Sequence, residues 1–116
     1  MSSRRALVVE DEVLVGMLIE DMLRDLGYEI AGLSTHLDEA VRLARTAAFD
    51  VALLDINLNG RQSFPVADAV RARGLPFLFA TGYGNRIVPE PYRDAPILPK
   101  PFSLEELRGA LQRAGL

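Results

Sequence analysis

Short apolar runs alternate with longer amphipathic stretches along this chain of 116 residues. The apolar runs predict five strands, at 6–9, 28–33, 50–54, 76–80 and 96–98. Apolar positions at helical spacing predict helices at 12–26 and 37–48, a third that begins near Pro65 and stops at Gly74, and a last one after Ser103. Ser103 and Glu106 have the spacing of a capping box. Strands that alternate with helices are typical of a parallel sheet built from βαβ units.

The stretch 82–95 breaks this rhythm where a fourth helix is expected. It contains Gly84, Pro89 and Pro91, and a proline inside a helix costs about 3 kcal/mol or more. We therefore predict a loop with at most one or two helical turns.

The chain has no repeats and no linker, so we expect one domain over 1–116. The initial Met1 favours a complete protein.

Composition and charge exclude several classes of function. The chain has no cysteine and one histidine, which excludes disulfides, thiolate catalysis and cysteine-rich or histidine-rich metal sites. A net charge of -3 without a dense Lys/Arg cluster argues against direct binding of nucleic acid. No apolar run approaches the roughly 20 residues of a membrane span, and no signal peptide precedes the first strand. We expect a cytoplasmic protein without membrane contact.

Polar side chains stand where four of the predicted strands end. Glu10 and Asp11 follow the first strand, Asp55 the third, Thr81 the fourth, and Lys100 lies just past the fifth. In a parallel sheet these ends lie along one edge, where open α/β folds bind ligands. Residues up to 90 positions apart are therefore expected to share one pocket.

The residue types in this predicted pocket suit one metal ion and one phosphoryl group. Acidic residues after a strand can serve only to stabilise the N-terminus of the next helix. Asp55 at the end of the neighbouring strand, however, would repel the other two acids, and a divalent cation relieves this repulsion. Oxygen ligands favour Mg²⁺, with Mn²⁺ as the alternative ion. Lys100 supplies a positive charge for a phosphate and Thr81 a hydroxyl donor. A remaining carboxylate can then act as a nucleophile, as in aspartyl-phosphate enzymes.

Four motifs, in order, carry a resemblance to a known family. They are Leu-Val-Val-Glu-Asp-Glu at 7–12, Leu-Leu-Asp-Ile-Asn-Leu at 53–58, Ala-Thr-Gly at 80–82 and Pro-Lys-Pro-Phe at 99–102. Over essentially its whole length the chain resembles the response-regulator receiver domains of two-component signalling. The stretch 76–83 is similar to the subgroup named for its Phe-Ala-Thr-Gly motif. The expected fold is a flavodoxin-like, doubly wound α/β domain with five parallel strands in the order 2-1-3-4-5.

The resemblance also implies roles for individual residues. Asp55 would be the phosphoacceptor, and Glu10, Asp11, Asp55 and the main-chain carbonyl of Asn57 would hold Mg²⁺. Thr81 would bind the phosphoryl group and shift with it, and Lys100 would pair with it. The peptide from Lys100 to Pro101 is expected to be cis.

The implied function is regulatory rather than enzymatic. The phosphoryl donor would be a histidine kinase or a histidine phosphotransfer protein, whereas the sequence does not name the output partner, and homodimerisation stays open. Receivers commonly carry Tyr or Phe three residues before the lysine, but Ile97 stands there. As a hypothesis, Tyr83 and the 83–95 loop respond to phosphorylation together with Thr81.

Three alternatives remain open at this point. Asp55 to Gly60 matches the first half of an EF-hand calcium loop, but Val66 replaces the final glutamate. A phosphatase of the haloacid dehalogenase type would need an aspartate where Asn57 stands. A degenerate receiver would keep the fold and act only as a protein-interaction module.

The four phenylalanines at 64, 77, 79 and 102 and the methionines at 17 and 22 are interpreted as packing residues.

Overall fold

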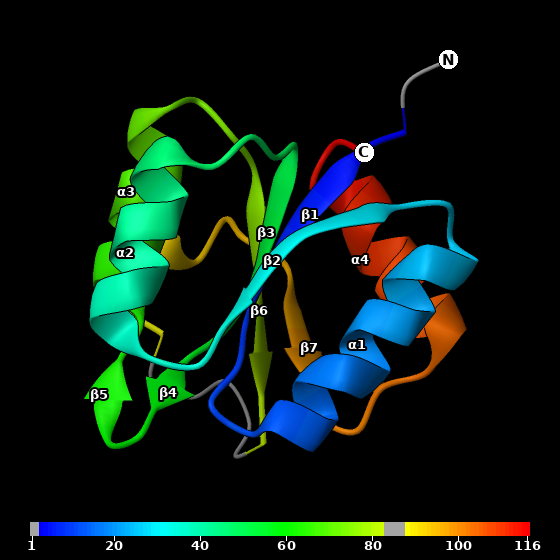
Figure 1. The fold of residues 1–116 in the computed structure, drawn as a ribbon, viewed down its shortest axis with the longest axis horizontal. Helices are drawn as coiled ribbons and strands as arrows, with labels where there is room; N and C mark the ends of the chain where they lie inside the picture. Colours follow the sequence, from blue (N-terminus) through cyan, green and yellow to red (C-terminus); the bar gives the residue numbers. More distant parts are fainter. Residues whose placement is uncertain (1–2, 83–87) are drawn as a thin grey trace.

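The computed structural model describes residues 3–82 and 88–116. Its centre is a parallel sheet of β1 (Arg5–Val9), β2 (Glu29–Ser34), β3 (Val51–Asp55), β6 (Phe77–Thr81) and β7 (Ile97–Pro99). The strands lie in the order β2-β1-β3-β6-β7, which is the predicted order 2-1-3-4-5 (Figure 1). The doubly wound, flavodoxin-like α/β fold is confirmed.

Helices cover both faces of the sheet (Figure 1). The helices α1 (Val13–Asp25) and α4 (Leu104–Arg113) pack on one face, and α2 (Leu37–Thr46) and α3 (Phe64–Ala72) pack on the other. Successive side chains of a strand point to opposite faces, so Ala6 and Val8 join the core under α1 and α4 while Leu7 and Val9 join the other. Burial on both faces explains why the strands read as continuous apolar runs.

Most of the predicted packing residues are buried. The phenylalanines at 64, 77, 79 and 102 all lie in the two cores, and Met22 packs against the core from α1. The prediction for Met17 was wrong, because its side chain is 50% exposed. It belongs to an apolar group on the outer face of α1 that we call the α1 patch, consisting of Val13, Leu14, Met17 and Leu18. The helix is apolar over a wider arc than the sheet can cover.

The chain that follows β3 forms an antiparallel hairpin of β4 (Asn57–Leu58) and β5 (Arg61–Gln62). Asn59 and Gly60 between them have φ values of 53° and 85°. A two-residue type I′ turn needs positive φ at both positions, and Asn-Gly is its preferred pair. The pair was visible in the sequence, so this hairpin could have been predicted.

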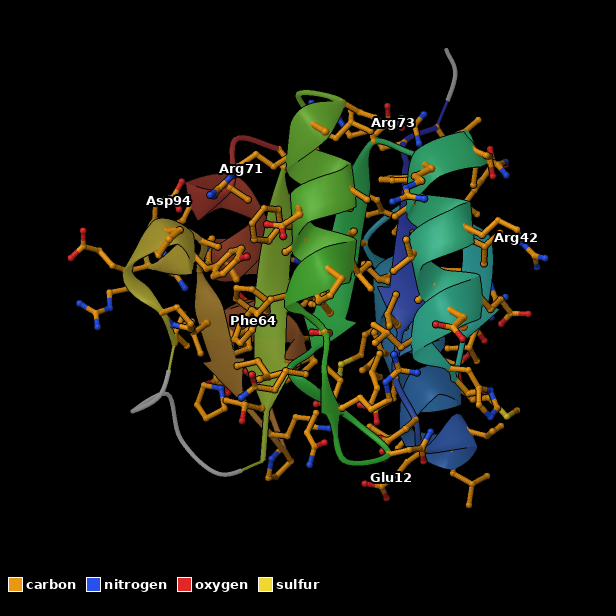
Figure 2. All side chains as sticks on the ribbon, turned by 90° about the vertical axis from the view of Figure 1, so that its left-hand side faces the viewer. Glu12, Arg42, Phe64, Arg71, Arg73 and Asp94 are labelled. Atoms are coloured by element: carbon orange, nitrogen blue, oxygen red, sulfur yellow. The ribbon has the colours of Figure 1, made fainter. Side chains whose placement is uncertain are left out.

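The segment 82–95 has no fourth helix in its described part, residues 82 and 88–95. It contains one short 3₁₀ turn, η1 (Glu90–Tyr92), as predicted. Tyr92 stacks on Phe64 at 4.7 Å between ring centroids and donates a hydrogen bond to Asp68 of α3. Arg71 of α3 pairs with Asp94 at 2.8 Å (Figure 2). These contacts hold the segment against α3.

Two further expectations concern local features. The peptide from Lys100 to Pro101 is cis, as expected. Among the described residues, no helix has the length and apolar character needed to cross a membrane.

The capping box before α4 is confirmed and gives a stability prediction. Ser103 Oγ accepts a hydrogen bond from the Glu106 backbone N–H at 3.1 Å, and Glu106 Oε1 accepts one from the Ser103 N–H at 2.9 Å. Ser103→Ala removes the oxygen that satisfies an unpaired helix donor, so we expect the free energy of unfolding in urea to fall by about 1 kcal/mol. Ser103→Asp keeps an acceptor and serves as the control. An alanine variant as stable as the wild type would contradict the capping role.

Candidate phosphoryl and metal site

The carboxyl ends of the parallel strands form the floor of a pocket of about 580 Å³. Its lining comes from α1, β3, β6 and the segments that follow the strands. The lining residues are Asp11, Glu12, Val15, Leu18, Ile19, Met22, Asp55, Asn57, Thr81, Gly82, Lys100, Pro101 and Phe102. One wall is apolar and the floor is charged, which suits a ligand that brings both an anionic group and an apolar partner.

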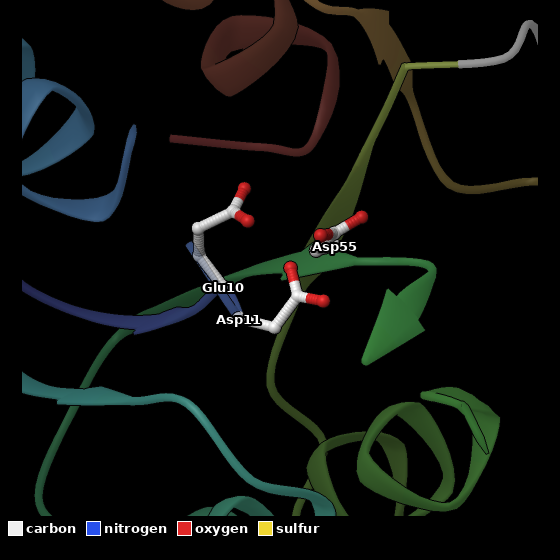
Figure 3. A group of neighbouring side chains, drawn as sticks. All are labelled: Glu10, Asp11 and Asp55. Atoms are coloured by element: carbon white, nitrogen blue, oxygen red, sulfur yellow. The ribbon is translucent and has the colours of Figure 1, made fainter. Parts of the chain in front are cut away.

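Three carboxylates meet at this edge of the sheet (Figure 3). Glu10 and Asp11 follow β1, and Asp55 is the last residue of the adjacent strand β3. Each residue offers one oxygen, and these oxygens lie within 4.8 Å of one another. Glu10 is fully buried and Asp55 nearly so, whereas Asp11 is partly exposed. The predicted gathering of distant acids is therefore present in the structure.

Lys100 reaches back into the same cluster. Its Nζ lies 2.8 Å from Glu10 Oε1 and 3.4 Å from Asp55 Oδ2. Its backbone N–H donates to the Thr81 carbonyl at 2.8 Å, which ties the end of β7 to the end of β6. Thr81 is buried and lines the pocket beside Asp55. All five residues singled out in the sequence share this pocket or its charged floor.

The ionisation of the cluster reflects its burial. Desolvation, reinforced by the negative charge of Glu10, raises the pKa of Asp55 from 3.8 to about 7, although Lys100 acts in the opposite direction. For Lys100, desolvation alone would lower the pKa, but its contacts with Glu10 and Asp55 outweigh this and raise it. A single ammonium therefore does not fully stabilise three adjacent carboxylates.

The donor set fits a divalent cation. Carboxylate oxygens from two adjacent strands are the ligands that Mg²⁺ takes, and Mg²⁺ keeps further positions for waters and phosphate oxygens. In formal terms the three carboxylates carry three negative charges, which Lys100 and a divalent ion together would balance. Burial and the charge of Glu10, which together raise the pKa of Asp55, are effects that a bound divalent cation would offset.

One residue of this site was not singled out in the sequence. The backbone N–H of Asn59, in the turn of the β4–β5 hairpin, donates to Asp11 Oδ2 at 3.0 Å. The signal that could have found it is the Asn-Gly pair four residues after Asp55, since a tight turn there brings the chain back towards the strand ends. The same hairpin removes the EF-hand alternative, because the acidic residue closes a strand of the sheet and a hairpin follows it.

The proposed switch residues are only partly visible. Tyr83 lies outside the described residues. Ile97 is half-buried and packs against the core under α2 and α3. The side chain at this position therefore lies at the edge of the core, and its part in a response to phosphorylation stays a prediction.

Comparisons with known proteins agree with this geometry. Residues 6–112 match the family of response regulator receiver domains. The transcriptional regulatory protein PdtaR of Mycobacterium tuberculosis is 35% identical over 96% of the chain, which covers 56% of PdtaR. The chain therefore spans about half the length of this curated relative.

Solved structures show the same likeness. The solution structure of SdrG from Sphingomonas melonis Fr1 superposes with a TM-score of 0.89 at 38% identity, and all of both chains is covered. The receiver domain of the sensor histidine kinase PA1611 from Pseudomonas aeruginosa PAO1 has a TM-score of 0.80 at 29% identity over 97% of this chain and 98% of that one. Its crystal structure has a magnesium ion coordinated in the active site cleft.

The raised pKa of Asp55 predicts how the stability of the metal-free protein depends on pH. Between about pH 4 and pH 7 the folded chain holds a proton on Asp55 that the unfolded chain releases, so the free energy of unfolding falls as the pH rises through this window. Asp55→Asn removes the buried charge. In the presence of a chelator, urea denaturation should show this variant to be more stable than the wild type at about pH 8, with the difference fading towards about pH 4. A difference that grows towards acid would contradict the assigned pKa.

Proposed function

Because the chain belongs to the response regulator receiver domain family, we propose that it works as a phosphorylation switch in which Asp55 accepts the phosphoryl group. The observation that carries this proposal is the meeting of Asp55 with Glu10, Asp11 and Lys100 in one pocket. A buried carboxylate beside an ammonium and further acids is the arrangement that aspartyl-phosphate chemistry needs.

The transfer step follows from this arrangement. A carboxylate oxygen of Asp55 attacks the phosphorus of a phosphohistidine in line with the bond to nitrogen. The new P–O bond forms as the P–N bond breaks, and the electron pair stays on the imidazole nitrogen, which takes up a proton. Lys100 and the Thr81 hydroxyl bind oxygens of the transferred group, so positive charge and a donor lie where negative charge accumulates.

The metal ligands in this proposal are Glu10, Asp11, Asp55 and the main-chain carbonyl of Asn57. Bound Mg²⁺ supplies charge neutralisation for the phosphoryl oxygens, and Mn²⁺ with its similar preference for oxygen ligands is the alternative ion. Without an ion, burial and repulsion between the carboxylates disfavour the ionised state of Asp55, which is the state that acts as the nucleophile. We therefore expect phosphorylation to require the ion.

The same site distinguishes a switch from its rivals. A phosphatase would use a second acid two residues after the nucleophile, but the exposed Asn57 stands there, so the phosphorylated chain is expected to persist rather than turn over many esters. A degenerate receiver, which acts only by binding other proteins, would gain no phosphate. The cytoplasmic location inferred from the sequence stays a prediction.

The partner that delivers the phosphoryl group needs a surface beside Asp55, and the α1 patch provides one. Leu14 and Leu18 are 77% and 62% exposed, and Leu18 also lines the pocket that holds Asp55. Large apolar side chains gathered on a surface mark interaction sites. We assign the α1 patch to the histidine kinase or phosphotransfer protein, because a docked donor there places its phosphohistidine next to the acceptor.

The output side is assigned to β6 and the segment after it. Thr81 binds the phosphoryl group, and Tyr83 and the segment 88–95 carry the response, since Ile97 offers no aromatic ring to rotate. The contacts of Tyr92 and Arg71 with their neighbours give that segment a defined position from which it can move.

The proposed acceptor predicts the outcome of a labelling experiment. Incubation with acetyl phosphate and Mg²⁺ should add the mass of one phosphoryl group to the intact chain, and a chelator should prevent it. Asp55→Asn should abolish the addition because the nucleophilic oxygen is lost, whereas Asp25→Asn, which changes an exposed acid of α1, should be labelled like the wild type. Mass spectrometry of the intact protein measures this. Undiminished labelling of the Asp55 variant would refute the assignment, and an unlabelled wild type would favour the degenerate receiver.

The proposed docking surface gives a separate prediction. Leu14→Gln with Met17→Gln makes the α1 patch polar without touching the residues that line the pocket. We expect phosphotransfer from a phosphorylated histidine phosphotransfer protein to slow by about tenfold or more, since apolar anchors dominate such interfaces. Labelling by acetyl phosphate, which needs no docking, should be unchanged. Arg42→Gln on the exposed side of α2 is the control (Figure 2). Equal slowing by both donors would count against a docking role.

A further inference from the structure

The tip of the β4–β5 hairpin contacts both the proposed metal ligand Asp11 and the connection that follows β2. The Asn59 backbone N–H donates to Asp11 Oδ2 at 3.0 Å, and the Asn59 side-chain Nδ2 donates to the Thr35 carbonyl at 3.1 Å. Thr35 lies in the connection between β2 and α2. A single exposed residue therefore links the partly buried acid after β1 to the connection that follows the neighbouring strand.

The backbone conformation of Asn59 makes this double contact feasible. Its φ of 53° lies in the left-handed region, which asparagine and glycine tolerate better than other residues. The turn is closed further by Asn57 Oδ1, which accepts a hydrogen bond from the Gly60 N–H at 2.9 Å. The tip is thus held by its own turn and by Thr35, and its N–H points at the carboxylate.

The geometry points to Asn59 as a positioning residue for the metal ligand Asp11, an inference that rests on the proposed function. Asp11 is only partly buried, so its carboxylate would rotate freely without a fixed partner. The hydrogen bond commits Oδ2 to the hairpin and leaves Oδ1 for the ion. Outer partners of this kind orient a metal ligand and are worth about 10- to 100-fold in metal affinity.

The hydrogen bond from Asn59 to Thr35 also affects how the hairpin responds to the ion. Because the Asn59 side chain ties the hairpin to the β2–α2 connection, ion binding at Asp11 and the position of the hairpin are thermodynamically coupled. We expect the hairpin to respond to the ion through this contact and through Asn57, whose backbone N–H lies 3.4 Å from Asp55 Oδ1. The amide of residue 59 is the natural reporter of this coupling.

The test is a titration of the full chain with MgCl₂, followed by backbone amide signals in NMR. In the wild type, the amide of residue 59 should shift with the same Kd as the amides of the strand ends. Asn59→Gly keeps the N–H and the tolerance of positive φ but loses the anchor to Thr35, so it should raise the Kd for Mg²⁺ by about tenfold. Arg61→Ala is the matched control, since it removes the exposed contact of the same hairpin with Asp38 and touches no carboxylate of the site.

The same substitution in a second variant distinguishes positioning of Asp11 by Asn59 from a general loosening of the hairpin. In Asp11→Asn, which weakens Mg²⁺ binding by itself, the further change Asn59→Gly should have no additional effect, because Asn59 acts through Asp11. Wild-type affinity in Asn59→Gly, equal weakening by Arg61→Ala, or additive effects in the Asp11→Asn background would each overturn the inference. Absence of Mg²⁺ binding in the wild type would instead overturn the proposed function.

Discussion

Repulsion among three acids at one edge of the sheet is the constraint on which the site depends. Glu10, Asp11 and Asp55 offer oxygens within 4.8 Å of one another, and two of these side chains are buried. Burial of Asp55, reinforced by the like charge of Glu10, raises the pKa of Asp55 to about 7 even with Lys100 in contact. The cluster therefore favours the binding of a cation. A divalent ion and then a phosphoryl group with its own oxygens are ligands that turn this unfavourable arrangement into a favourable one.

The fold supplies the rigidity that keeps the acids together. β1 and β3 are hydrogen-bonded neighbours in the middle of the sheet and are buried by helices on both faces, so the residues that close them cannot move apart independently. The elements around the rim combine buried and exposed parts. The β4–β5 hairpin and the segment 88–95 bury Leu58, Val88 and Ala95 in the core and add polar or aromatic contacts, and α1 keeps one apolar face exposed. The centre therefore provides the chemistry, while the rim provides surfaces that can respond to it or bind partners.

Much of this arrangement follows from the sequence, because it depends on simple periodicities. Apolar runs that end in Glu10, Asp55 and Thr81 predicted both the parallel sheet and the shared edge, and the motifs predicted the family. What was missed depends on tertiary contacts. The amphipathic pattern of α1 could not tell which apolar side chains the sheet covers, so Met17 was interpreted as a packing residue although its side chain is exposed. Nor could the sequence show that the Asn59 N–H would meet Asp11, since the two lie 48 positions apart. The Asn-Gly pair itself, in contrast, was a local signal that was not used.

The central claim is that these acids share one ion beside the phosphoryl position, and a crystal structure with Mg²⁺ and beryllofluoride tests it most directly. The account predicts a single ion bound by oxygens of Glu10, Asp11 and Asp55 at about 2.1 Å. The fluoride group should lie on Asp55, with Lys100 turned from Glu10 towards it. An ion bound elsewhere, or acids that remain paired only with Lys100 at saturating ion concentration, would contradict the account.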